Sequence, residues 1–417
     1  MKQKTALEIL KDGHNVFLTG AAGSGKTYLL NEYIDYLKEN KSKVAITAST
    51  GIAATHIGGR TIHSWSGMGI KDDLDNKDIT QMLKKPIIRE RLTKTDVLII
   101  DEVSMVHAHQ LDLINKILRL ARGSWEPFGG MQVVLSGDFF QLPPISRNTE
   151  DKVKFAFESQ SWKELKIKSC YLTEQFRQEE DDIVQILSDI RNGKVGDETR
   201  NLLQDLIDDP FKDDNAESTK LFTHNVDVDN INNRELSKLE TPSLAYQMAT
   251  DGNEMIITAL QKGCLAPEKL ILKEGALVMF VRNNFEEGYV NGTVGRVIDF
   301  SEDKFPIVEI ANGEEIVVFP EKWSIEEEGE TLAELTQLPL RLAWAITVHK
   351  SQGMTLDSAE MDLSKAFEYG MGYVALSRVK TLSNMKLLGI NDMALQVHPD
   401  ICKKDKEFQK LSKQIEK

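Results

Sequence analysis

The chain has 417 residues and a hydrophobic fraction of 41%, which is ordinary for a globular protein of two or three domains. Its 51 basic and 65 acidic residues give a net charge of −14. This charge argues against a protein that coats nucleic acid through a general basic surface, but it is compatible with binding in a narrow basic groove. No run approaches the roughly 18 apolar residues of a membrane span, the first residues lack a targeting pattern, and the cysteines at positions 170, 264 and 402 form no metal or disulfide motif.

Short apolar strands alternate with helical patterns in the first part of the chain. Strands are predicted at residues 16–19, 44–48, 97–100 and 131–136, and a helix is predicted from about Lys26. A second set of strands is predicted at residues 170–173, 220–223, 338–344, 359–363 and 385–390. This alternation predicts an α/β fold in which helices cover parallel sheets.

Two later segments depart from this alternation. From about residue 268 to residue 336, strand-like segments are separated by turns without a helical pattern, which predicts a small all-β insert. The tail from residue 400 to residue 417 is rich in lysine and acidic residues, and it is predicted to form a charged helix that lies in solvent.

The most specific motif is GAAGSGKT at residues 20–27, which matches a P-loop between a predicted strand and a predicted helix. Its glycines let the backbone curl so that successive N–H groups face a phosphate chain, and the start of the helix adds its positive end. Lys26 is predicted to reach the terminal phosphates of ATP, and Thr27 to supply a hydroxyl to Mg²⁺. The predicted nucleotide-binding residues of this loop are Gly20, Ala22, Gly23, Ser24, Gly25, Lys26 and Thr27.

Two further motifs follow apolar strands, at the edge where open α/β sheets bind ligands. In IIDEVSM, Asp101 is predicted to orient Mg²⁺ and Glu102 to polarise the attacking water; the alternative is an acidic pair at a helix start. In SGDFFQLPP, Gln141 carries an amide that can contact both the γ-phosphate and a water, and the alternative is a structural turn.

Two arginines are candidates for stabilising charge on the γ-phosphate. Arg177 lies in YLTEQFRQ and Arg378 in GYVALSRVK, and both are expected outside the domain that carries the P-loop. Arginines delivered across a cleft make hydrolysis depend on closure of that cleft. The alternative is that each is an ordinary surface residue.

The order and wording of these motifs, from residue 3 to about residue 390, resemble the PIF ("petite integration frequency") family of DNA helicases, in the RecD-like branch of superfamily one (superfamily 1B). Segments that carry the resemblance include ASTGIAATHIGGRTIHSW, DEVSM, LDLINKILRLAR, FGGMQVVLSGDFFQLPP, LTEQFRQ, ITVHKSQGMTLD and YVALSR. The resemblance implies two RecA-like P-loop NTPase domains, a Src-homology-3-like β-barrel and a small wedge. The first RecA-like domain would occupy residues 1–169, with the wedge at about 66–92. The second would occupy residues 170–267 and 337–399, with the barrel inserted at 268–336 and the charged helix following at 400–417.

The resemblance also implies roles for individual residues. Gln3 would contact the adenine base, Arg177 and Arg378 would be arginine fingers, and Gln352 and Gly353 would border the nucleotide. Small residues and an aromatic suit contacts with single-stranded DNA; Trp65 as core packing and His63 as a buried histidine are the alternatives. The implied DNA-binding residues are Thr50, Gly51, His63, Trp65, Thr223, Asn225, His349, Lys350 and Ser351.

The implied activity is ATP-driven translocation along single-stranded DNA from 5′ to 3′, with unwinding of tailed or forked duplexes. The family adds G-quadruplexes as a further partner, and roles in DNA repair, replication, recombination and telomere maintenance. A monomer in a bacterial or phage-infected cytoplasm, associated with the nucleoid and not with a membrane, is expected. The alternatives are a nucleotide-switched remodelling ATPase that does not unwind, and a motor on RNA, since no residue clearly tests for a 2′-hydroxyl.

Overall fold

The computed structural model describes residues 1–69, 73–144, 153–177, 181–208, 219–284, 286–289, 291–310, 312–327, 330–356 and 358–416. The chain forms two compact units, which are described separately: Met1–Arg177 with Val397–Lys417, and Gln178–Gln396. Among the described residues, no helix is both long and apolar enough to cross a membrane.

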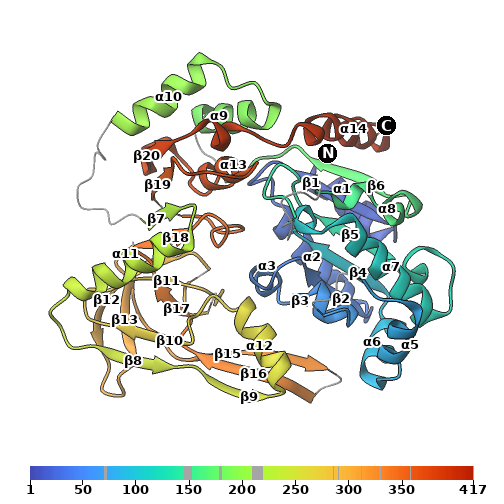
Figure 1. The fold of residues 1–417 in the computed structure, drawn as a ribbon, viewed down its shortest axis with the longest axis horizontal. Coiled ribbons are helices and arrows are strands. Elements are labelled where there is room, and N and C mark those ends of the chain that lie inside the picture. The colour runs from blue at the N-terminus through green and yellow to red at the C-terminus, as the bar shows by residue number, and fades with distance from the viewer. Residues whose placement is uncertain are drawn as a thin grey trace. The chain divides into compact units, whose positions relative to one another are not determined.

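The first unit is built on a six-stranded parallel sheet, in the order β3-β2-β4-β5-β1-β6 (Figure 1). The central strands β1 and β4 are buried along their whole length, as expected of a sheet covered on both faces. The strands are β1 (Val16–Gly20), β2 (Val44–Ala48), β3 (Arg60–Thr61), β4 (Val97–Asp101), β5 (Gln132–Ser136) and β6 (Lys168–Leu172).

The helices of the first unit follow the predicted alternation, and the helix predicted from Lys26 begins at that residue. They are α1 (Gln3–Lys11), α2 (Lys26–Glu39), α3 (Gly51–His56), α4 (Ile62–Ser66), α5 (Asn76–Met82), α6 (Pro86–Lys94), α7 (Ala108–Arg122), α8 (Gln160–Glu164) and α14 (Pro399–Ile415). Short 3₁₀ turns, η1 (Val103–Met105) and η3 (Ala156–Glu158), lie after β4 and before α8. The α5–α6 pair falls in the segment expected to hold the wedge.

Two sequence predictions about this unit are wrong. The strand predicted at residues 170–173 was expected to begin the second domain, but it belongs to β6, which pairs in parallel with β1 along five positions. The C-terminal helix α14 is not surrounded by solvent: the Phe408 side chain is 4% exposed and packs on Phe17 at a ring distance of 4.8 Å, and the Tyr171 backbone N–H in β6 donates to the Ser412 hydroxyl. Most charges of α14 face outward, whereas its buried face carries Ile401, Phe408 and one acidic residue, Asp405, which accepts from the Tyr171 hydroxyl.

The second unit contains a four-stranded parallel sheet in the order β18-β7-β19-β20. Its strands are β7 (Thr219–Phe222), β18 (Ala345–Thr347), β19 (Ala359–Leu363) and β20 (Met385–Ile390). The associated helices are α9 (Asp181–Asn192), α10 (Asp197–Asp208), α11 (Asn225–Lys238) and α13 (Met371–Leu376), with 3₁₀ turns η4 (Leu382–Asn384) and η5 (Asp392–Leu395). The α/β class predicted from strand–helix alternation is therefore confirmed in both units.

The remainder of this unit is antiparallel, in sheets of five, three and two strands with the orders β14-β13-β12-β11-β17, β15-β16-β9 and β10-β8. It begins earlier than predicted, with β8 (Leu244–Gln247), and it includes the helix α12 (Glu254–Gly263). It also ends later, because β17 (Leu340–Leu342), predicted for the parallel sheet, pairs antiparallel with β11. The other strands are β9 (Ala249–Gly252), β10 (Lys269–Leu272), β11 (Leu277–Phe280), β12 (Val294–Phe300), β13 (Pro306–Ile310), β14 (Glu315–Val317), β15 (Glu321–Glu327) and β16 (Glu330–Gln337).

Candidate functional site

The P-loop joins the buried strand β1 to helix α2, so its backbone is held at both ends. Gly23 and Gly25 have φ values of 83° and 79°, in the left-handed region that favours glycine. The Lys26 ammonium donates to the carbonyl oxygens of Gly20 and Ala21 at 3.0 and 3.1 Å, so the lysine lies folded over the loop. Thr27 is the second residue of α2 and is exposed.

Gln3 and the segment after β6 both approach the P-loop. The Gln3 side-chain amide donates to the Gly25 carbonyl at 3.2 Å, and a Cβ at Gly25 would lie 2.1 Å from that amide nitrogen and 3.3 Å from the Phe176 ring. Gln175 donates from its amide to the Ala22 carbonyl at 3.0 Å, and the Phe176 backbone N–H donates to the Gly23 carbonyl at 3.0 Å. Position 25 favours glycine because its φ of 79° lies in the left-handed region, and a Cβ there would also displace the Gln3 amide.

This arrangement corrects the placement of Arg177. The arginine was expected on the second domain, but it directly follows Phe176 in the first unit, on a segment tied to the P-loop by one backbone and one side-chain hydrogen bond. Phe176 itself is 62% exposed, so its ring is accessible beside the loop. Sequence reasoning missed Gln175 and Phe176; their position next to a candidate arginine finger was the only signal that could have found them.

The acidic motif lies at the carboxyl end of β4. Asp101 is 8% exposed, and burial raises the pKa of its carboxyl, while the Ser136 side chain and the Lys26 ammonium oppose that rise. A bound divalent cation would favour the ionised carboxylate, so Asp101 together with Thr27 has the chemistry that a Mg²⁺ site needs. Glu102 has φ 50° and ψ 45°, a left-handed backbone that is uncommon for a residue with a side chain.

Gln141 follows β5, the strand between β4 and β1. Its side chain is 7% exposed, and its backbone N–H donates to the carbonyl of Asp138 at 3.0 Å in a tight turn. Below this turn, Phe139 packs in an aromatic cluster with Phe17 and Trp162. A Cβ at Gly137 would lie 2.9 Å from the backbone nitrogen of Val103, so the two motifs touch.

The candidate DNA residues of the first unit divide into exposed and buried ones. The Thr50 hydroxyl accepts from the Ala53 backbone N–H at 3.2 Å and so caps α3, whose first residue is Gly51. His63 is partly exposed in α4. Trp65, in contrast, is 4% exposed, so its indole packs in the core and does not present a face to a base. The core-packing alternative therefore holds for Trp65.

In the second unit, the turn TVHKSQG follows β18. Ser351 is fully buried and its hydroxyl donates to the Val348 carbonyl at 2.8 Å, which corrects its predicted contact with DNA: this side chain shapes the turn from inside. His349 and Lys350 are partly exposed, whereas Gln352 is 8% exposed and Gly353 has φ 80°.

The Lys350 ammonium lies in a charged setting. Its pKa is lowered, first by burial and then by the Arg341 guanidinium, while Asp229 opposes the shift. Thr223, after β7, is 6% exposed and its hydroxyl lies 2.8 Å from His224 Nδ1. Asn225 begins α11, and its side chain is outside the described residues.

Arg378 is 1% exposed, and its guanidinium points into the second unit. It donates to the carbonyls of Val374 at 2.7 Å, Ser351 at 3.2 Å and Met354 at 3.0 Å, and to the Ser377 hydroxyl at 2.7 Å. In this conformation the side chain braces the turn that was predicted to couple ATP to DNA. Its role as an arginine finger stays a prediction.

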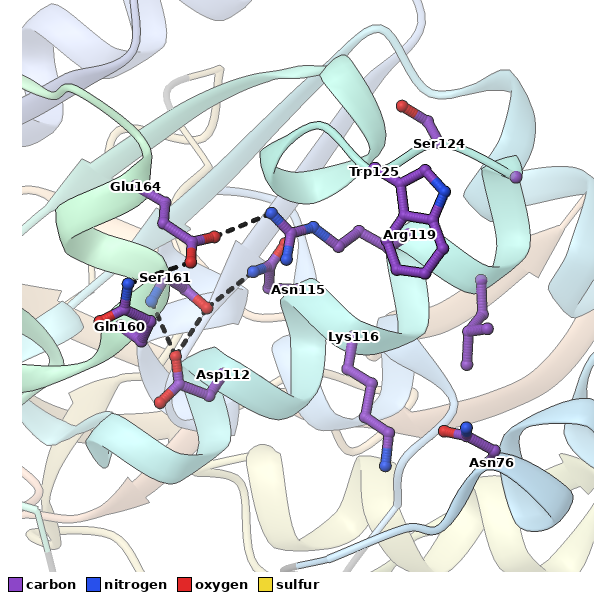
Figure 2. Close-up of a pocket in the computed structure, with 12 residues that line it drawn as sticks. Asn76, Asp112, Asn115, Lys116, Arg119, Ser124, Trp125, Gln160, Ser161 and Glu164 are labelled. Carbon is purple, nitrogen blue, oxygen red and sulfur yellow. Dashed lines mark hydrogen bonds and ion pairs between the residues drawn. The ribbon is translucent and has the colours of Figure 1, made fainter.

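A pocket of about 520 Å³ lies beside α7, in the segment whose pattern resembles the family signature (Figure 2). None of the predicted site residues lines it. Its polar side chains partner one another: the Arg119 guanidinium bonds to Glu164 at 2.8 Å, and the Ser161 hydroxyl donates to Asp112 and accepts from Asn115 (Figure 2). This network holds α7 to α8 and explains part of the signature as packing.

Comparison with known proteins decides the family. A family model described as PIF1-like helicase matches residues 2–201, and a model of the DNA helicase Pif1 2B domain matches residues 257–300. The chain is 46% identical to the ATP-dependent DNA helicase Pif1 of Psychrobacter sp. (strain PRwf-1), over 99% of this chain and 71% of that protein. The chain belongs to the PIF1-like helicase family.

Solved structures agree with this assignment. The crystal structure of Bacteroides sp Pif1 in complex with ADP-AlF4 has a TM-score of 0.83 and 34% identity, covering 98% of this chain and 96% of that one. Bacteroides Pif1 bound to ssDNA has a TM-score of 0.66 and 32% identity, covering 97% and 95%. The PIF1-like chain described above is accordingly an ATP-dependent DNA helicase with two RecA-like α/β domains, as the family resemblance implied.

Proposed function

We propose that this chain moves 5′ to 3′ along single-stranded DNA and unwinds tailed or forked duplexes as it hydrolyses ATP. One observation carries the nucleotide half of the proposal. The P-loop, the Asp101–Glu102 pair and the Gln141 turn follow β1, β4 and β5, which are neighbours in one parallel sheet. Because parallel strands end at one edge, these groups gather where open α/β sheets bind ligands.

Each nucleotide-site residue then has a task. Lys26, which bonds to loop carbonyls in this structure, would turn to the terminal phosphates, and Gln3 with Phe176 would hold the adenine end. Thr27 and Asp101 would hold Mg²⁺, which neutralises charge on the phosphates when bound. Glu102 would take a proton from the attacking water, and Gln141 would orient that water. Arg177 and Arg378 would stabilise charge on the γ-phosphate, and Gln352 and Gly353 would border it.

The DNA half of the proposal rests on residues at loop and helix starts. Thr50, Gly51 and His63 of the first unit, with Asn225, His349 and Lys350 of the second, are the contacts we propose; Thr223 would act through its contact with His224. The solved relative bound to ssDNA supports this class of partner. A small set of phosphate contacts suits an acidic motor that must release DNA at every step, and it implies strong salt dependence.

The wedge is the second part of the DNA proposal. Helix α6 lies in the segment 84–94, which has five basic residues and one acidic residue. This local excess of positive charge contrasts with the net charge of −14 for the whole chain. Four of the basic side chains, Lys84, Lys85, Arg89 and Lys94, are exposed. We place the duplex junction against this element. The family resemblance adds three further expectations: the protein is a monomer, it lies in the cytoplasm near nucleoid DNA, and it acts on G-quadruplexes.

Strand separation tests the proposal on two duplexes that differ only in whether the single-stranded tail is 5′ or 3′, with ATP and Mg²⁺. Unwinding of the 5′-tailed duplex alone is the expected result. Unwinding of the 3′-tailed duplex alone would contradict the direction. ATP hydrolysis without unwinding would favour a remodelling switch, and stronger stimulation of hydrolysis by RNA than by DNA of the same sequence would favour an RNA motor.

A further inference from the structure

An exposed phenyl ring lies at the ligand-binding edge of the second parallel sheet. Phe367 is 54% exposed, although the alanine before it is buried. It belongs to the loop that joins β19 to α13, so it follows the carboxyl end of a parallel strand. Phe367 is not among the residues assigned to ATP or DNA above.

Two histidines flank this ring, and each comes from the loop after a different strand. The His224 ring, after β7, lies 5.2 Å from the Phe367 ring at an angle of 46°. The His349 ring, after β18, lies 6.4 Å away at an angle of 21°. Because β7 lies between β18 and β19 in the sheet (Figure 1), the three loops are neighbours and bring the rings into one group.

The charges around the group suit a polynucleotide. His349 Nε2 lies 3.8 Å from a Glu368 carboxylate oxygen, and the Thr223 hydroxyl lies 2.8 Å from His224 Nδ1. Lys350 follows His349 directly, and the exposed Lys365 is two residues before the phenyl ring. Flat rings beside cations are the combination that binds single strands without sequence preference, because every base has a face that can stack.

We propose that Phe367, with His224 and His349 beside it, is a base-stacking platform for single-stranded DNA. The phenyl ring takes the face of one nucleobase, and the neighbouring lysines take the flanking phosphates. The inference rests on the proposed function and adds a base contact to a set of phosphate contacts. It predicts binding that depends on the presence of bases but not on their sequence.

The test compares wild type with Phe367→Ala, Phe367→Trp and Phe319→Ala. Phe319 is the matched control because it is also 54% exposed and also lies in the second unit. Affinity is measured without nucleotide for an oligo-dT strand and for an abasic strand of the same length, over a range of salt concentrations. DNA-independent ATP hydrolysis reports whether each variant is folded.

Phe367→Ala should weaken oligo-dT binding by about fivefold to 100-fold. Its affinity for the abasic strand and the salt slope should stay at wild-type values, since no phosphate contact is removed. Phe367→Trp should bind oligo-dT as well as wild type, and its indole fluorescence should be quenched by the bases but not by the abasic strand. Phe319→Ala should match wild type throughout.

Three results would overturn the inference, and they are distinguishable. If wild type binds oligo-dT and Phe367→Ala binds it equally well, the platform is wrong and the proposed function stands. If wild type binds neither strand, the proposed DNA function fails and the platform fails with it. Equal losses on both strands would mean that Phe367 supports phosphate contacts rather than stacking, which also contradicts the proposal.

Discussion

Replacing Arg378 by alanine should disturb more than ATP hydrolysis. The guanidinium is almost fully buried and donates to three backbone carbonyls, two of them in the segment 351–354. A hydrogen bond from a charged group contributes about 1.5–3 kcal/mol. Removing the guanidinium takes one donor from each of these buried carbonyls, although the Ser351 and Val374 carbonyls still accept from the Met354 backbone N–H and the Ser377 hydroxyl. Because such contributions do not add, we expect the second unit to lose about 3 kcal/mol of unfolding free energy.

For a unit of this size, that loss lowers the melting temperature by about 6–12 °C. The affinity for single-stranded DNA in the absence of nucleotide should fall as well, because the turn that carries His349 and Lys350 loses its brace. Circular dichroism on heating and fluorescence anisotropy with a labelled oligonucleotide measure the two effects. Arg378→Lys, which keeps the charge but not the fork of donors, should give intermediate values.

A purely catalytic role for Arg378 predicts a different result. An arginine that served only as a finger could be removed with loss of hydrolysis alone. If Arg378→Ala melts at the wild-type temperature and binds DNA normally while hydrolysis disappears, the bracing role is wrong. Lys26→Ala is the control, because its ammonium is partly exposed and donates to carbonyls of the P-loop, so its loss should leave the melting temperature almost unchanged.

Three further outcomes follow from the structure. Lys26→Ala should abolish ATP hydrolysis while leaving DNA binding intact, and normal turnover would contradict the P-loop assignment. Lys350→Ala should weaken DNA stimulation of hydrolysis, and it should reduce the salt dependence of affinity for single-stranded DNA by about 0.7 in slope. Burial lowers the pKa of Lys350, so the affinity of wild type for DNA should fall as pH rises, starting at a lower pH than for an ordinary lysine. Lys350→Arg should keep its affinity over the same pH range. Phe408→Ala should reduce the unfolding free energy of the first unit by about 3–5 kcal/mol in urea titrations; an unchanged midpoint would show that α14 is not part of the core.

Local motifs were readable from the sequence because their chemistry depends on residues close together in the chain. The loop at 20–27 needs its glycines, lysine and threonine at fixed spacing, and the structure places it between a buried strand and α2 as predicted. The Asp101–Glu102 pair likewise follows a strand of continuous apolar residues, a pattern that predicts a buried parallel strand. For the same reason, the α/β class followed from strand–helix alternation alone.

Several assignments instead depended on partners far along the chain. The strand at 168–172 reads like any edge strand, and only its pairing with β1, some 150 residues earlier, places it in the first sheet. Helix α14 carries many charges, and its sequence therefore predicted a helix in solvent. In the structure Phe408 packs in an aromatic cluster with rings from three other segments, which no local pattern in α14 indicates. The strand at 340–342 likewise belongs to the antiparallel part of its unit, because it pairs with β11 and not with the parallel sheet.

The same distinction holds within the sites. The sequence by itself determined which residue types were available: a P-loop lysine, an acidic pair, arginines and polar turns. Only the tertiary structure decided that Trp65 and Ser351 face inward, that Arg177 follows a segment bonded to the P-loop, and that Phe367 meets histidines from two other loops. The physical reason is that burial and ring contacts arise from packing between distant segments, whereas a motif records only the spacing of its own residues.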